Sequence, residues 1–161
     1  EEIRRQLWRI VPMIHGSLVI RRSVLLEVGG YDERYRYSSD WDLYHRVLPR
    51  CRAANIPRRL LGIRRHPGQG SFIRGTFDEN VQIFSRLLAS QDRTPRDRRL
   101  LKRSLSYTYM MRARCGLQER RLGAMLGDVG RACRYSPATT LTQLVKPMVP
   151  VPVWTAIRRL A

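Results

Sequence analysis

The stretch GGYDERYRYSSDWDL, residues 29–43, decides how the first half of this chain folds. Its two glycines predict a turn, and the aromatic-rich loop after them leads to Ser38 and Ser39, which are good helix N-caps. Apolar side chains then recur at helical spacing, at Trp41, Tyr44, Val47 and Leu48. Asp40 therefore falls in the first turn of a helix, where backbone N–H groups and the helix dipole favour an ionised carboxylate. Such a group is suited to take a proton from a substrate hydroxyl.

The flanking segments give this stretch a recognisable context. Upstream lies HGS (residues 15–17) with a short apolar run, and downstream lies RRHPG (residues 64–68). This order resembles the acceptor-side half of the family 2 glycosyltransferases, which are inverting enzymes with the GT-A fold. In that family a strand with His-Gly-Ser precedes a short helix ended by Gly-Gly-Tyr-Asp, and an Arg-x-His-Pro-Gly stretch follows the catalytic loop. The resemblance covers roughly the first half of the chain, and Ser39 stands where the family has Glu or Gln.

The resemblance implies a C-terminal part of a GT-A (Rossmann-like) domain in residues 1–70, and the apolar pattern that follows predicts a helical extension in residues 71–161. Alternating strands and helices in the first part fit an α/β layer architecture. The expected strands are Gly16–Arg21, Arg52–Ile56 and Leu60–Arg65, and the expected helices are Ser23–Val28 and Asp40–Leu48. From Ser71 onward only helices are expected: Asp78–Ala89, one starting at Thr94 and Pro95 and ending near Gly116, Leu117–Cys133, a shorter one after Ser136, and Trp154–Leu160.

The nucleotide-binding half of the family, with its Asp-x-Asp metal motif, precedes the part that this chain resembles. Asp40 and Asp42 have that spacing, but their place in the order matches the catalytic loop instead. We therefore expect a C-terminal fragment of a longer enzyme that is inactive alone, because the donor site lies elsewhere.

Asp40 is the expected catalytic residue. Glycosyl transfer with inversion needs one base, which deprotonates the acceptor hydroxyl as it attacks the anomeric carbon opposite the leaving nucleoside diphosphate. The alternative is that Asp40 only caps its helix through backbone N–H groups. The resemblance favours the base.

Seven further residues are expected to contact the substrate: His15, Gly16, Ser17, Tyr31, Asp32, Trp41 and Asp42. A glycine lets a ligand approach the backbone closely, although a packed strand with a satisfied histidine accounts for the HGS residues equally well. Asp32 could instead hold a turn through its own side chain. Asp42 points away from Asp40 on a helix, which also suits a role in bracing the loop.

Arg65 and His66 are expected to bind the departing diphosphate, because positive charge stabilises a developing anion. His66 is also a candidate metal ligand, since imidazole binds divalent ions. The resemblance implies Mg²⁺ or Mn²⁺ and a nucleotide-diphosphate sugar as donor. A solvated basic strand end is the alternative for Arg64, and His45 is expected at the surface.

The chain is strongly basic, with 31 basic residues, 13 acidic residues and a net charge of +18. Only Lys102 and Lys146 are lysines, so arginine supplies nearly all of the positive charge. Nucleic acid, an anionic membrane and arginine-favouring codon usage could each account for it. Nucleic acid is disfavoured because the arginines are dispersed and no nucleic-acid-binding motif appears. The rival to catalysis is a basic helical module that binds an anionic membrane surface or nucleic acid.

The chain is expected to contact a membrane peripherally and not to cross it. No apolar run reaches the length of a transmembrane helix, and no signal peptide is seen. The C-terminal segment from Leu141 to Arg159 could lie in a membrane interface or pack on the preceding helices. The expected acceptor is a growing glycan or a lipid-linked sugar at the cytoplasmic face of the membrane.

Overall fold

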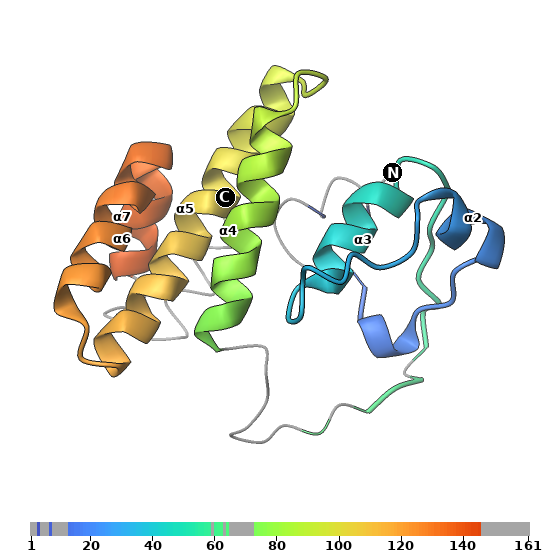
Figure 1. Cartoon of the computed structure of the whole chain (residues 1–161), viewed down its shortest axis with the longest axis horizontal. Helices are drawn as coiled ribbons and strands as arrows, with labels where there is room; N and C mark the ends of the chain where they lie inside the picture. Colours follow the sequence, from blue (N-terminus) through green and yellow to red (C-terminus); the bar gives the residue numbers. More distant parts are fainter. Residues whose placement is uncertain are drawn as a thin grey trace. The chain divides into compact units, whose positions relative to one another are not determined.

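The computed structural model describes residues 3, 7, 13–58, 60–62, 64 and 73–145 (Figure 1). Within these ranges the regular structure is entirely helical. The chain divides into two compact units, Glu1–Leu101 and Lys102–Ala161.

The expected α/β class, with part of a GT-A (Rossmann-like) domain, is wrong for the residues that the structure describes. His15–Ser17 form a 3₁₀ turn, η1, and the chain from Leu18 to Arg21 is extended without a paired strand. Residues 52–56 are also irregular, and so are the described residues of 60–65. A strand requires a neighbour that takes up its backbone hydrogen bonds. None of the described segments provides one, so the apolar run at residues 18–20 remains an isolated extended segment.

Helix α2, Arg22–Glu27, confirms the expected short helix and its glycine stop. Gly29 and Gly30 adopt φ values of 77° and 70°, a region that residues with a Cβ rarely occupy. Their backbone N–H groups donate to the carbonyls of Leu26 and Leu25. The glycine pair thus satisfies the end of α2 and turns the chain toward the next loop.

Helix α3, Ser39–Val47, confirms the expected helix within one residue. It packs against α4, Arg74–Ala89, which begins four residues before the predicted start. The Trp41 and Phe84 rings meet edge to face with centroids 5.4 Å apart. The first unit therefore has a helix–helix core, in which Leu43 and Ile83 are fully buried.

The prediction that His45 lies at the surface is wrong. Its side chain is 6 % exposed, and its ring meets Phe84 edge to face at 6.1 Å. The reason is the packing of α4, which covers the side of α3 that carries His45. Local sequence does not reveal which helix face a distant segment will cover.

Helix α5, Pro95–Gln118, begins in the first unit and continues into the second. Its start confirms the expected capping box: the Asp97 N–H donates to the Thr94 hydroxyl, and the Thr94 N–H donates to the Asp97 carboxylate. Proline at the first helical position is preorganised for this role.

The second unit contains the rest of α5 together with α6, Leu122–Tyr135, and α7, Pro137–Val145, which lie side by side in Figure 1. Arg112 on α5 donates to both oxygens of the buried Asp128 carboxylate on α6. Ser106 on α5 shares a hydrogen bond with Thr140 on α7. None of the helices built from the described residues combines the length and apolar character that a membrane crossing requires.

Candidate active site

Asp40 lies in the first turn of α3, as its helix-start position predicts. Its Oδ1 accepts a hydrogen bond of 2.8 Å from the Trp41 N–H. Within the part of the chain that the structure describes, its Oδ2 has no bonded partner. The residue is half-buried, and one of its carboxylate oxygens is held by the backbone.

A chain of hydrogen bonds links three side chains beside Asp40. His15 Nδ1 lies 3.0 Å from the Tyr44 hydroxyl, and His15 Nε2 lies 3.2 Å from the Tyr31 hydroxyl. Tyr44 follows Asp40 by four residues, so the two occupy one face of α3. Burial raises the pKa of the Tyr44 hydroxyl, and the nearby Asp40 carboxylate and Tyr31 raise it further. The structure therefore brings together His15 and Tyr31, which the sequence singled out, at Tyr44, which lies on the same face of α3 as Asp40.

Asp42 belongs to the opposite side of α3. It is fully buried, and its Oδ2 accepts bonds of 2.8 and 2.6 Å from the Arg46 guanidinium. Its Oδ1 accepts a hydrogen bond from Arg86 on α4. Arg46 also donates to the Val28 carbonyl at the end of α2. With both oxygens engaged by arginines, Asp42 joins three elements, which fits a bracing role better than a substrate contact.

The loop before α3 is held by a residue that sequence reasoning did not single out. The backbone N–H groups of Arg36, Tyr37 and Ser38 all donate to the Glu79 carboxylate of α4, at 2.7–2.8 Å. Ser38 is the residue before α3, but its hydroxyl makes no cap bond and donates instead to the Thr76 carbonyl. The start of α3 is therefore anchored to α4.

The other predicted contact residues have local partners. The Ser17 hydroxyl donates to the Ile14 carbonyl, which closes the η1 turn. Gly16 is exposed, and a Cβ there would make only an ordinary contact of 3.8 Å with Leu61. Trp41 packs on Phe84 and stacks on His45, so its ring serves the core.

Asp32 holds a turn with its own neighbour. Its carboxylate accepts bonds from the Arg34 backbone N–H and from the Arg34 guanidinium. The hydrogen bonds from the Arg34 side chain lower the pKa of Asp32 to about 2. Arg86 lies 4.0 Å from the same carboxylate, which places Asp32 at the edge of the Asp42 network.

The described residues do not fit a divalent cation. Among them, no group of three or more His, Cys, Asp or Glu side chains is placed to hold a metal ion. Asp40 and Asp42 face different sides of α3, and the Asp42 oxygens already bind arginines. Arg65 and His66, predicted to bind the diphosphate and, for His66, a metal, lie outside the described residues.

Comparison with known protein families gives a match to the segment that contains Asp40 and its neighbours. Residues 7–75 match the model described as glycosyltransferase like family 2. No curated protein and no solved structure gives a significant match. The match supports a glycosyltransferase-related function, and it contains η1, α2 and α3 with all four residues of the Asp40 cluster (Asp40, His15, Tyr31 and Tyr44).

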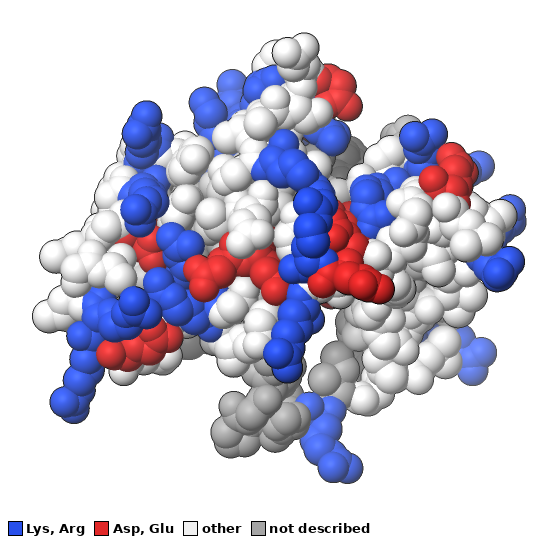
Figure 2. Space-filling view, in the orientation of Figure 1, with Lys and Arg blue, Asp and Glu red and all other residues white. Residues whose placement is uncertain are grey.

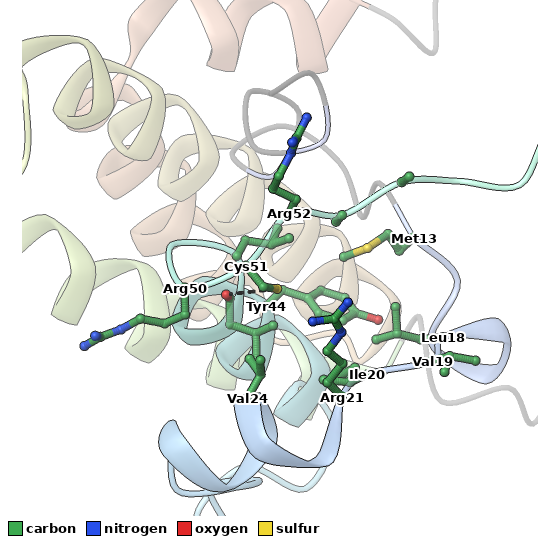
Figure 3. A pocket seen from close by; sticks show the side chains of 14 residues that line it. Met13, Leu18, Val19, Ile20, Arg21, Val24, Tyr44, Arg50, Cys51 and Arg52 are labelled. Atoms are coloured by element: carbon green, nitrogen blue, oxygen red, sulfur yellow. Dashed lines mark hydrogen bonds between the residues drawn. The ribbon is translucent and has the colours of Figure 1, made fainter.

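Within the glycosyltransferase-like region, a cavity of about 490 Å³ opens beside Tyr44 (Figure 3). Most of its lining is apolar, from Met13, Leu18, Val24, Val47 and Leu48 among others. Arg21, Arg50 and Arg52 contribute to the same lining, and Arg50 is paired with Glu27 at 3.3 Å. Tyr44 therefore connects two features, because its hydroxyl binds His15 and its side chain lines the cavity.

Positive charge is spread over the visible face of both units and is not gathered in one patch (Figure 2). Some of it is structural. Arg46 and Arg86 neutralise Asp42, and Arg112 and Arg131 neutralise Asp128. Part of the arginine excess therefore stabilises buried carboxylates.

Sequence reasoning missed Tyr44, Arg86 and Glu79 as contributors to this site. The apolar pattern marks Tyr44 only as a core position of a helix, although its spacing of four from Asp40 is a signal that places it on the same face. The Asp42–Arg46 pair carries the same spacing. Arg86 and Glu79 lie more than forty residues beyond their partners' loop or helix, and no local pattern indicates them.

Proposed function

We propose that this chain forms the acceptor-side part of a glycosyltransferase that moves a sugar from a nucleotide-diphosphate sugar to a glycan or lipid-linked acceptor, with inversion. The observation that carries the proposal is the position of Asp40 within the family-matched residues. Its carboxylate has one oxygen held by a backbone N–H and the other without a partner among the described residues, and the Tyr44 hydroxyl lies on the same face of α3.

Asp40 acts as the general base in this proposal. The acceptor oxygen forms a bond to the anomeric carbon while the bond from that carbon to the diphosphate oxygen breaks. The acceptor proton passes to Oδ2 of Asp40, and the bonding electrons leave with the nucleoside diphosphate. The Trp41 N–H bond fixes the direction of the carboxylate, so the base is positioned before the acceptor arrives.

Tyr31 binds a hydroxyl group of the acceptor, and it is oriented by His15, whose two ring nitrogens are both engaged within the protein. Both side chains are exposed and carry groups that can donate or accept hydrogen bonds. Tyr44, buried beneath them, holds His15 from the other ring nitrogen. Asp42 and Asp32 support the site through their arginines and do not touch the substrate.

The apolar cavity beside Tyr44 favours a lipid-linked acceptor over a free glycan. Its walls can exclude water from a hydrocarbon chain, and Arg21 and Arg52 supply positive charge for a phosphate linkage. Such an acceptor would place the reaction at the cytoplasmic face of a membrane, with the chain bound peripherally.

A second candidate is a non-enzymatic module that binds an anionic membrane surface. It is favoured by α7, which carries no charged residue and exposes Leu141 and Leu144. Together with the net charge of +18, this helix could lie in a lipid interface. That module would bind anionic vesicles with a steep salt dependence and would be unaffected by Asp40→Asn.

The experiment that tests the proposed reaction follows the fate of the sugar. The complete gene product is incubated with a panel of nucleotide-diphosphate sugars and short-chain lipid phosphates or oligosaccharides. We expect release of nucleoside diphosphate that depends on acceptor, and a product whose anomeric configuration by NMR is opposite to that of the donor. A product with retained configuration would refute a single displacement with Asp40 as base.

A further inference from the structure

The Glu79 carboxylate makes three backbone hydrogen bonds to successive residues of one loop. Its Oε1 accepts the Arg36 N–H at 2.8 Å, and its Oε2 accepts the Tyr37 and Ser38 N–H groups at 2.7 and 2.8 Å. Successive N–H groups that converge in this way form an anion-binding nest. Because the acceptor is charged, each bond is stronger than a neutral one.

The position of the nest gives these bonds a consequence for catalysis. Ser38 is the last residue before α3, and Asp40 follows it by two residues. Ser38 is fully buried, so its N–H would lose a partner inside the protein without Glu79. The direction in which α3 starts, and hence the place of the Asp40 carboxylate, depends on this loop.

Two other contacts from the first turn of α4 act on the same loop. The Ser38 hydroxyl donates to the Thr76 carbonyl. The Tyr37 ring lies against Gly75, where a Cβ would come within 2.6 Å of Cε2. Gly75, Thr76 and Glu79 therefore hold Tyr37 and Ser38 from the start of one helix, but only Glu79 does so with a charge.

We propose that Glu79 is a positioning residue that holds Asp40 in its reactive place through the backbone of residues 36–38. This inference rests on the proposed function of Asp40. It assigns a role in the site to α4, of which all but the first two residues lie beyond the family-matched region 7–75. The helical segment after that region thus completes the site.

Two substitutions of Glu79 remove different numbers of its backbone hydrogen bonds. Glu79→Ala removes all three bonds. Glu79→Gln keeps one oxygen for the Tyr37 and Ser38 N–H groups, but its amide NH₂ faces the Arg36 N–H, so at least one bond is lost. The matched control is Asp78→Asn, which also removes one negative charge from α4 but at a side chain directed to Arg74 (3.9 Å).

Hydrogen exchange in the complete gene product tests the nest without any substrate. We expect the amides of residues 36–38 to be protected in the wild type and in Asp78→Asn, and to exchange at least about tenfold faster in Glu79→Ala. Unchanged exchange in Glu79→Ala would overturn the inference at its first step, whatever reaction Asp40 performs.

Sugar transfer then tests the consequence, at a temperature well below each unfolding midpoint. We expect kcat to fall about a hundredfold in Glu79→Ala and about tenfold in Glu79→Gln, since displacement of a base by about 1 Å has effects of this size. KM for the donor should stay within about twofold of the wild type, and Asp78→Asn should resemble the wild type.

The outcomes separate this inference from the proposed function. If Asp40→Asn abolishes transfer but Glu79→Ala leaves kcat unchanged despite faster exchange, the positioning role is refuted and the base remains. If Asp40→Asn leaves kcat unchanged, the proposed function fails and the positioning role fails with it, even though the exchange result stands.

Discussion

His15 and Tyr44 are joined by a hydrogen bond of 3.0 Å between the imidazole Nδ1 and the phenol oxygen. The two residues come from different elements, η1 and α3, and Tyr44 is only 1 % exposed. The bond occupies one ring nitrogen of His15 and leaves the other facing Tyr31 at the surface. The buried tyrosine therefore sets how the exposed histidine is presented.

Tyr44→Phe should disturb this presentation while keeping the buried ring. We expect a loss of about 1 kcal/mol in the free energy of unfolding, the usual worth of one hydrogen bond. KM for the acceptor should rise several-fold, because His15 loses its fixed orientation. Chemical unfolding and steady-state kinetics measure the two effects. Tyr107→Phe, at an exposed tyrosine of α5, is the control and should change neither.

Asp42→Asn and Asp40→Asn should differ sharply in stability although the residues are two apart. The Asp42→Asn change would weaken the hydrogen bonds from Arg46 and Arg86, whose side chains are partly exposed, and we expect a loss of about 1–3 kcal/mol. After Asp40→Asn the new amide oxygen can still accept the Trp41 N–H, so only a helix-dipole interaction of less than about 1 kcal/mol is lost. Urea unfolding of the two variants compares them directly. Equal destabilisation would contradict the assignment of Asp42 as the structural acid.

Gly75→Ala should destabilise the protein through Tyr37. The new Cβ would lie 2.6 Å from the ring, which must move while its backbone N–H is held by Glu79. We expect a loss of about 1–2 kcal/mol, a typical cost of overpacking. In a Tyr37→Ala background the same change should be neutral or stabilising by up to about 1 kcal/mol, because alanine is the better helix former. Additive effects in this double-mutant cycle would show that the contact does not restrict position 75.

Stability should fall as the pH drops, because of His45. Burial lowers the pKa of His45 from 6.5 to about 3, helped by Arg93 and Arg86 and opposed by Asp42. Between these values the unfolded chain binds a proton at this imidazole and the folded chain does not, so acid favours unfolding. The contribution is complete above pH 6.5 and decreases by up to about 1.4 kcal/mol per unit below it. Unfolding at about pH 7, 6 and 5 should show this slope, and His45→Gln should reduce it.

Asp32 acts in a lower pH window, which allows the two effects to be separated. The Arg34 hydrogen bonds lower the pKa of Asp32 from 3.8 to about 2. Its contribution to stability is present above pH 3.8 and is lost as the pH falls toward 2. A loss of stability that begins only below about pH 4 would therefore contradict the role of His45.

Local signals in the sequence predicted most of the helices. Gly29, the Thr94–Asp97 capping box and Pro137 each act within a few residues, and α2, α5 and α7 begin or end at them. The strands were predicted wrongly because a strand is defined by its partner, and residues 18–21 have none among the described segments. An apolar run of three residues cannot distinguish a paired strand from an extended segment.

The candidate site was likewise predictable only where local sequence determines the position of a residue. The place of Asp40 at a helix start was predicted from local sequence, whereas its role as base was inferred from the family resemblance and stays a prediction. Its neighbour Tyr44 could have been found from the spacing of four. Glu79 and Arg86 could not, because their contacts depend on how α4 packs against α3. Long-range contacts of this kind follow from tertiary packing and leave no periodic trace in the sequence.

The measurement that tests the central claim most directly is kcat for sugar transfer by Asp40→Asn in the complete gene product. Removing a general base typically lowers the rate by about 10² to 10⁴. We predict a fall within that range, with the affinity for the nucleotide-diphosphate sugar unchanged and the free energy of unfolding within about 1 kcal/mol of the wild type. A kcat close to that of the wild type would contradict the assignment of Asp40 as the base and the account of the site built around it.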